Sequence, residues 1–224
     1  KMIKNNAPNL QIVGDELIAP FGKVQDFNPY VSKIKLSGAD TVLTGNWGPD
    51  AYRFVNALAD AGVKVKLFGI YISQPAGISA MGKNLLHNNV VIVKEFNPTN
   101  PKASSSYKKI EEGFLESTGF TPDADRIRVM FNMFKSAIKK SNSIEPKEIA
   151  YALEGMQSEG LDGSYKMRED DHQVHFNMQA LLLTEKNKQS IIYRNTDSDM
   201  SYKNVGSIPM EDITLKTSCE MKRP

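Results

Sequence analysis

Short apolar, β-branched segments alternate with amphipathic segments through residues 1–96, at a repeat of roughly 22–25 residues. This alternation predicts parallel strands connected by helices, which is an α/β arrangement. Ligands of such sheets bind at the carboxyl ends of the strands, so a site is expected in the loops that follow the strands. The predicted strands are 9–19, 41–45, 65–70 and 90–96, and the predicted helices are 27–39, 49–62 and about 75–86.

The pattern changes after Phe96. Residues 97–106 (NPTNPKASSS) are rich in Pro, Asn and Ser, which predicts a linker or hinge. Two helices with apolar residues at i, i+3, i+4 spacing are expected next, followed by a third that begins at Pro146 and ends before Gln157. Residues 160–224 return to extended character and end in a polar tail. The apolar faces are expected to hold Tyr107, Ile110, Phe114 and Leu115 in the first helix, and Ile127, Met130, Met133, Phe134, Ala137 and Ile138 in the second.

Composition and charge narrow the possible classes of protein. The chain has 28 Lys and Arg against 26 Asp and Glu, a formal charge of +2, and its basic residues are scattered rather than clustered. This pattern does not indicate a nucleic-acid partner. No apolar run approaches the ~18 residues of a membrane span, so no membrane insertion is expected.

The two ends of the sequence are informative in different ways. The opening KMIKNN is typical of the last turn of a helix, so we expect the chain to be cut from something longer at its amino end. The lack of a signal peptide then says little about the compartment. The single cysteine, Cys219, is either a free thiol or half of a disulfide whose partner lies outside this sequence.

The turn TGNWGPD after the second predicted parallel strand is the first candidate site. Gly45 and Gly48 flank Asn46 and the only tryptophan, Trp47, and Asp50 opens the next helix. A strand-to-helix turn presents backbone N–H groups and the positive end of the helix, and an indole ring can stack on an apolar, planar or cationic group. The alternative is that Trp47 fills the space between strand and helix and Asp50 is a routine cap.

Tyr71 begins the loop after the next predicted strand. Adjacent strand ends point into one crevice, so Trp47 and Tyr71 are expected to face the same ligand. The alternative is a tyrosine packed in an interface with its hydroxyl in water.

Enzyme signatures are weak. Residues 136–139 (SAIK), 198–200 (SDM) and 216–218 (KTS) follow the order of β-lactamase motifs, but two of them are imperfect and only 18 residues separate the last two. His172 and His175 lie beside carboxylates, yet in an extended segment their rings point to opposite faces, which favours a solvated loop over a zinc site. Glycine-rich nucleotide motifs and G-x-S-x-G are absent from the sequence. No cofactor and no catalysis are expected.

The wording of four stretches resembles the substrate-binding proteins of branched-chain amino acid ABC transporters. These stretches are PFGKVQDFNPYVSKIKLSGADTVLTGNWGPD, NPTNP, YALEGMQSEGLDGSYKMREDDHQ and CEMKRP, and the resemblance extends over essentially the whole chain. It implies a type I periplasmic binding protein fold: two Rossmann-like α/β lobes with parallel sheets, joined by a hinge of three crossovers, around a ligand cleft. It also implies an amino-terminally truncated form.

The resemblance implies a division of the chain into three parts. Residues 1–96 would form most of ligand-binding lobe two, 97–158 the hinge and lobe-one helices, and 159–224 the return crossing, strands and carboxyl-terminal tail. Without the rest of lobe one, the apolar faces around Phe114 and Phe134 are expected to be exposed, so this piece alone would aggregate or pair. A cysteine in the missing part would make Cys219 a structural disulfide.

The resemblance also implies a binding site formed by Gly45, Asn46, Trp47, Gly48 and Tyr71. Trp47 falls where amino-acid binders place an aromatic against the ligand. Tyr71 falls where leucine and isoleucine binders place an acidic residue that pairs with the ligand ammonium group. Its lack of charge disfavours a simple α-amino acid and favours a cation held by ring faces, or an aromatic or amide ligand.

The expected function is that of a periplasmic solute-binding protein of an ABC importer. It would capture a small polar ligand (an amino acid, amide or related compound) by closing two lobes, with hinges near residues 96–98 and Gly160, and deliver it to the membrane permease. The first alternative is a ligand-sensing module of the same fold that feeds a regulator or receptor. The second is an α/β enzyme, which lacks any nucleophile–base pair or metal cluster in the sequence.

Overall fold

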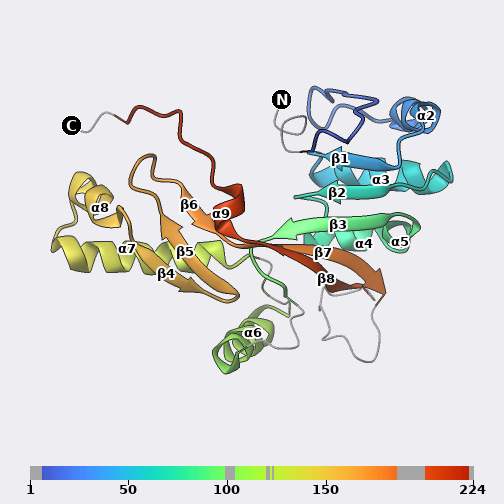
Figure 1. Ribbon diagram of the computed structural model, residues 1–224. Coiled ribbons are helices and arrows are strands. Elements are labelled where there is room, and N and C mark those ends of the chain that lie inside the picture. The colour runs from blue at the N-terminus through green and yellow to red at the C-terminus, as the bar shows by residue number, and fades with distance from the viewer. Residues whose placement is uncertain (1–6, 99–103, 120–121, 123, 186–199, 222–224) are drawn as a thin grey trace. The chain divides into compact units, whose positions relative to one another are not determined.

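The computed structural model describes residues 7–98, 104–119, 122, 124–185 and 200–221. The chain forms two compact units, residues 1–92 and 93–224. Helices and strands occur in both units (Figure 1). The predicted helical turn at residues 1–6 and the SDM motif at residues 198–200 lie wholly or partly outside the described residues.

A parallel sheet forms the centre of the first unit. Its strands are β1 (Thr41–Thr44), β2 (Lys66–Gly69) and β3 (Asn89–Lys94), in the order β1-β2-β3. The register aligns Thr41 with Lys66 and Thr44 with Gly69. Three of the predicted strands, and their parallel pairing, are therefore confirmed. The helices of this unit are α2 (Asn28–Ser37), α3 (Gly48–Asp60), α4 (Pro75–Met81) and α5 (Asn84–His87).

The prediction of a strand at residues 9–19 was wrong, because this segment has no regular structure. Its apolar side chains are exposed: Leu10 by 64%, Val13 by 43% and Leu17 by 89%. A strand is stabilised by ladder hydrogen bonds and by burial of one face, and this segment has neither among the described residues. The β-branched composition alone does not produce a strand.

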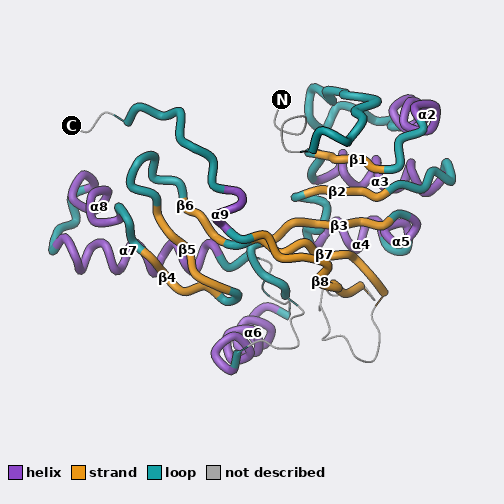
Figure 2. The backbone as a smooth tube through the Cα atoms, in the orientation of Figure 1, coloured by secondary structure: helices purple, strands orange, loops and turns teal. Residues whose placement is uncertain are grey.

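Helix α3 packs its apolar face into the core of the first unit. Phe54, Val55 and Leu58 are at most 3% exposed, as are Leu67 of β2 and Ile92 of β3. Helices α3 and α4 lie on one face of the strands (Figure 2). Each fully buried large aliphatic side chain contributes about 1.5–3 kcal/mol to folding. The carboxyl ends of β1 and β2 are thus anchored to a packed layer.

The second unit combines helices with antiparallel strands. Helices α6, α7 and α8 confirm the three helices expected after the linker, and Pro146 is at the first turn of α8 as predicted. Their core holds Val129, Met133 and Tyr165. The elements are α6 (Ser105–Thr118), α7 (Arg126–Ser141), α8 (Pro146–Leu153), α9 (Met210–Ile213), the sheet β4 (Gln157–Gly160), β5 (Gly163–Met167) and β6 (Val174–Phe176), and the antiparallel pair β7 (Met178–Glu185) and β8 (Met200–Ile208).

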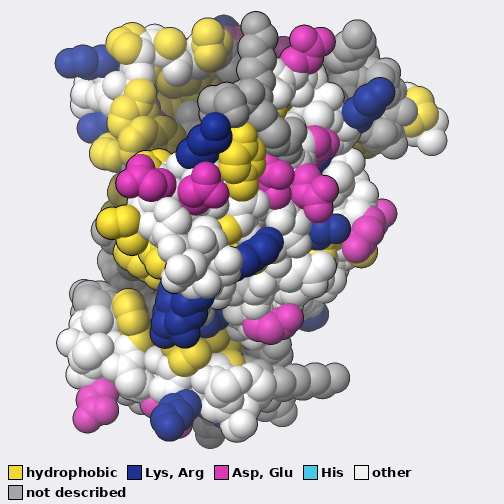
Figure 3. All heavy atoms as spheres, turned by 90° about the vertical axis from the view of Figure 1, so that its left-hand side faces the viewer, with side chains coloured by type: hydrophobic (Ala, Val, Ile, Leu, Met, Phe, Trp, Pro, Cys, Tyr) yellow, Lys and Arg dark blue, Asp and Glu magenta, His cyan; other side chains and the backbone are white. Residues whose placement is uncertain are grey.

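The apolar residues of α7 do not share one environment. Val129, Met133 and Ala137 are buried, at 2% exposure or less. Another stripe of the same helix remains uncovered in the described part of the chain, and it includes residues that the sequence placed on the same face as Met133. Its members and their exposures are Ile127 52%, Met130 43%, Phe131 65%, Phe134 42% and Ile138 39%. Hydrophobic side chains are visible among charged ones on the surface drawn in Figure 3.

Candidate functional site

The carboxyl edge of β1 and β2 holds the residues that the sequence singles out. Thr44 and Gly69 are paired in the parallel ladder, so the loops that follow them start at adjacent positions on one edge of the sheet. Trp47 lies in the first loop and is 48% exposed, and Tyr71 lies in the second and is 49% exposed. Large aromatic side chains with half of their surface in water are available to a ligand.

The turn that carries Trp47 has a backbone that requires glycine. Trp47 is extended and immediately precedes α3, whereas Gly48 has a φ of 53°. A side chain at Gly48 would be strained in this conformation. Asn46 and Gly45 complete the turn, and the Asn46 amide donates to the Thr44 hydroxyl at 3.1 Å. The turn therefore follows the strand in a fixed conformation.

Trp47 does not fill the space between strand and helix. Its ring stacks on Phe21, with the ring centroids 4.0 Å apart and an angle of 3° between the planes. Phe21 is itself 46% exposed, so the two rings form a partly exposed aromatic pair on the surface of the first unit. Sequence reasoning missed Phe21, because a single aromatic residue in an irregular loop has no periodicity that connects it with another turn.

Asp50 does not cap α3, which corrects the alternative interpretation from sequence. Helix α3 has no side-chain cap hydrogen bond at its amino end. Asp50 is 1% exposed and its Oδ2 accepts the Gly22 amide at 2.7 Å, while its Oδ1 lies 3.5 Å from Nη1 of Arg53. The same Nη1 donates to the Val24 carbonyl oxygen at 3.3 Å. We call Asp50 and Arg53 the loop clamp, because together they attach the loop that carries Phe21 to the first turn of α3.

The second loop buries Ile72 and leaves the aromatic residue before it, Tyr71, exposed. Ile72 is fully buried and its Cδ1 lies 2.5 Å from the position that a Cβ of Gly69 would occupy. A side chain at Gly69 would require the side chain of Ile72 to move. Ile70 and Tyr71 are left 54% and 49% exposed, beside the edge of the sheet.

The charge of this edge differs from that of a site built for an ammonium group. Residues 45–50 and 70–74 contain one carboxylate, that of Asp50, and it is buried in the loop clamp. A ligand cation would find aromatic faces here and no exposed carboxylate in these two loops.

Two segments predicted as hinges lie together in the second unit. The Asn97 amide donates to Oδ2 of Asp162 at 3.3 Å, next to the turn that follows Gly160. Glu95, 7% exposed, accepts the Asp125 amide at 3.2 Å and pairs with Arg126 at 2.9 Å. Carboxylates therefore connect the segment after β3 to the β4–β5 turn and to the amino end of α7.

The buried carboxylate of Asp125 adds further hydrogen bonds to this cluster. It is 1% exposed and its two oxygens accept from Arg128 at 2.7 and 3.0 Å. Its Oδ2 also accepts the Leu161 amide. Because a buried carboxylate without partners is costly, these bonds fix the position of the β4–β5 turn.

The remaining reactive residues do not form a site among the described residues. Ser136 is exposed on α7, and no group of three or more His, Cys, Asp or Glu side chains in the described ranges is arranged to hold a metal ion. His172 pairs with Glu154 at 3.1 Å, whereas His175 contacts Thr214 at 2.6 Å, so the two rings have separate partners. The described helices include none with the length and apolar character needed to cross a membrane.

An open hollow of about 400 Å³ occurs at the opposite edge of the first sheet. It is lined at the amino ends of β2 and β3, by Lys66 and Asn89 among others. In a parallel α/β sheet the carboxyl edge is the favoured ligand site, so we give the aromatic edge more weight than this hollow.

Comparison with known proteins supplies independent information. A family model described as periplasmic binding protein matches residues 2–188. A Leu/Ile/Val-binding protein homologue of Brucella melitensis biotype 1 is 30% identical over 226 aligned residues, which cover 95% of this chain and 51% of that protein. The chain thus spans about half the length of the curated relatives it matches.

Solved structures agree in fold. The closed conformation of a leucine-, isoleucine-, valine-, threonine- and alanine-binding protein from Brucella ovis has a TM-score of 0.83 and 27% identity, with 99% of this chain and 57% of that chain covered. A solute-binding protein of an ABC transporter from Rhodopseudomonas palustris HaA2, in complex with p-hydroxybenzoic acid, has a TM-score of 0.63 and 18% identity, with 84% and 50% covered.

Proposed function

The chain belongs to the periplasmic binding protein family, and on that premise we propose that it is part of a solute-binding protein of an ABC importer. In this proposal the complete protein works in the periplasm, captures a small polar ligand (an amino acid, amide or related compound) and delivers it to the permease. The observation that carries the proposal is the half-exposed Trp47 at the carboxyl edge of a parallel sheet. Tyr71 follows the adjacent strand at the same edge.

The proposed ligand site in this chain consists of Gly45, Asn46, Trp47, Gly48 and Tyr71. The two rings supply broad contact surface with few rotatable bonds, so little conformational entropy is lost when a ligand binds. The glycines keep the turn compact and let backbone groups approach the ligand.

The chemistry of this edge favours the uncharged, flat or apolar part of a ligand. The carboxylate of Asp50 is buried, with its Oδ2 accepting the Gly22 amide and its Oδ1 3.5 Å from Nη1 of Arg53. The relative from Brucella ovis is named for leucine and other amino acids, and that from Rhodopseudomonas palustris was solved with an aromatic acid. We infer that groups outside these two loops bind any ligand charge, while the loops described here contact the side chain or ring.

Closure of the two lobes would use the segments after β3 and around Gly160. The boundary between the compact units falls at residues 92 and 93, just before the Glu95 and Asn97 contacts. We propose that these contacts hold both hinge segments to one body, so that bending is limited to a few residues. The division into 1–96, 97–158 and 159–224 is part of this proposal.

The test is calorimetric titration of the full-length protein with leucine and with 4-hydroxybenzoate, comparing wild type with Trp47→Ala. Removal of a central aromatic anchor is expected to cost about 2 kcal/mol or more, or about 30-fold in affinity. Leu36→Ala is the matched control, because Leu36 is 88% exposed on α2. Equal affinity of wild type and Trp47→Ala for a bound probe would contradict the site, and binding of neither probe would contradict the ligand class.

A further inference from the structure

We propose that Phe21 is a positioning residue of the ligand site, which holds the indole of Trp47 in its binding orientation. The proposal rests on the function proposed above and adds to it a residue from a different loop. Its basis is the parallel stack of the two rings, with centroids 4.0 Å apart and planes within 3°.

A stacked neighbour matters because Trp47 is at the end of a loop and is 48% exposed. An indole in that position, if unsupported, has several rotamers available, and a ligand that requires one of them must overcome the loss of the others. The Phe21 ring covers one face of the indole and so selects a rotamer before the ligand arrives. Pre-ordering of this kind increases affinity without a new ligand contact.

The loop clamp makes Phe21 a rigid support. Gly22, the next residue, donates its amide to the buried Asp50, and Arg53 donates to the carbonyl oxygen of Val24, two residues further along the loop. Both anchors belong to the first turns of α3, the helix that Trp47 immediately precedes. The two rings are therefore attached to one end of one helix, by separate routes.

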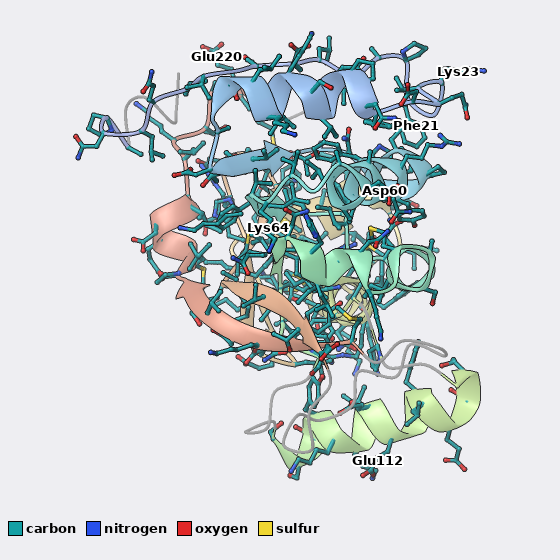
Figure 4. The ribbon with its side chains drawn as sticks, turned by 90° about the vertical axis from the view of Figure 1, so that its right-hand side faces the viewer. Phe21, Lys23, Asp60, Lys64, Glu112 and Glu220 are labelled. Atoms are coloured by element: carbon teal, nitrogen blue, oxygen red, sulfur yellow. The ribbon has the colours of Figure 1, made fainter. Side chains whose placement is uncertain are left out.

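The glycine at position 48 also contributes to this geometry. A Cβ at Gly48 would lie 3.7 Å from Cζ of Phe21. The Phe21 ring therefore lies within reach of a side chain at position 48, as well as against the indole. Figure 4 labels Phe21 and Lys23 on the same loop, with Lys23 pointing outward. Lys23 is exposed, which makes it the matched control for changes in this loop.

The first measurement needs no ligand. Acrylamide quenching of Trp47 fluorescence is measured in the full-length protein, with the signal of Trp47→Phe subtracted so that only Trp47 is observed. Phe21→Ala is expected to raise the quenching constant about twofold, because the covered ring face becomes accessible. Phe21→Tyr, which keeps the stack, and Lys23→Ala should match wild type. Unchanged quenching in Phe21→Ala would overturn the proposal.

The second measurement links orientation to binding. Titration with leucine and with 4-hydroxybenzoate should show that Phe21→Ala binds about 2- to 10-fold more weakly than wild type. Phe21→Tyr, which keeps the stacked ring, should bind with wild-type affinity. A thermal melt of each variant checks that the fold is retained. If Trp47→Ala loses binding while Phe21→Ala keeps wild-type affinity, the positioning role is wrong and the proposed function stands. If neither variant alters binding of a probe that wild type binds, the proposed site itself is wrong.

Asp50→Ala provides a second, independent variant. It removes the acceptor of the Gly22 amide and is expected to raise the quenching constant as Phe21→Ala does, because the loop is released from α3. A folded Asp50→Ala protein with wild-type quenching would show that the clamp does not position Phe21, and this part of the proposal would fail.

Discussion

Helices α3 and α7 are both amphipathic, but they leave different kinds of apolar surface in water. In α3 the large aliphatic and aromatic side chains of the apolar face are buried, whereas α7 buries one stripe and exposes another that includes Phe131 and Phe134. Near α3 the exposed apolar residues Phe21 and Trp47 are on loops; the loop clamp attaches the loop of Phe21 to α3, and Trp47 stacks on Phe21.

The exposed aromatic residues near α3 are typical of a surface that binds a small molecule, whereas the exposed stripe of α7 is typical of a surface that packs against another protein element. Aromatic residues on clamped loops present a small, rigid area, as ligand sites do. A regular helical stripe of residues such as Ile127, Met130 and Phe134 presents a long, flat area that fits another protein element. In our proposal the edge beside α3 binds ligand, and we expect the open face of α7 to pack against another protein element.

The largest expected effect is in the core beneath α3. Leu58→Ala should lower the free energy of unfolding by about 2–5 kcal/mol, because it removes a fully buried side chain and leaves a cavity. Ile127→Ala on α7 is the matched change at a residue that is 52% exposed, and its effect should stay within about 0.5 kcal/mol. Urea denaturation of the 224-residue chain measures both. Both variants are compared at concentrations below those at which the chain associates, so equal losses would mean that the stripe on α7 is covered within the monomer.

The next effect concerns association of the chain. The exposed stripe on α7 should cause the 224-residue chain to self-associate, as apolar patches of this kind do. Phe131→Lys combined with Phe134→Lys should shift the population towards monomer, measured by sedimentation velocity. Lys substitutions at two exposed polar positions of the same helix, Asn132 and Ser136, provide the control for added charge. A monodisperse wild-type monomer that melts cooperatively would contradict the prediction.

The sequence predicted the parts of the fold that depend on local pattern. β-branched runs located β1, β2 and β3 to within about two residues, and i, i+3, i+4 spacing located α6 and α7. The same signal was misleading at residues 9–19, because strand formation also needs a partner. The two stripes of α7 were merged for a related reason: a period shows that side chains share a face, but not which of them another element covers.

The site was only partly predictable. Trp47 and Tyr71 could be chosen from their place after strands, and their role remains a prediction. Phe21 and the clamp of Asp50 and Arg53 could not be predicted, because contacts between a loop and a helix distant in sequence leave no periodic pattern. Asp50 even resembles a cap by position, although its actual partner is the Gly22 amide.

The smallest expected effect is at Tyr165, where the core beneath α7 contains a polar atom. Its hydroxyl is buried and has no hydrogen-bond partner among the described residues. Burial, reinforced by the negative charges of Glu95 and Asp125, raises the pKa of Tyr165 far above its ordinary value. Tyr165→Phe should therefore be neutral or stabilise the chain by up to about 1 kcal/mol at pH 7, because the cost of the unpaired hydroxyl disappears. A loss of more than that amount in urea denaturation would show that the hydroxyl has a partner.

The same residue gives a pH dependence with a defined sign. In the unfolded chain the tyrosine ionises near pH 10, whereas in the folded chain it stays neutral to higher pH. The unfolded state thus releases a proton first, so the contribution of Tyr165 to stability is constant below about pH 10 and falls as the pH rises above it. Tyr165→Phe should reduce this fall, and Tyr107, whose pKa burial also raises, should preserve part of it. A wild-type slope in Tyr165→Phe, measured by urea denaturation at pH 9 and pH 11, would mean that Tyr165 already ionises in the folded chain, and that water reaches the core beneath α7.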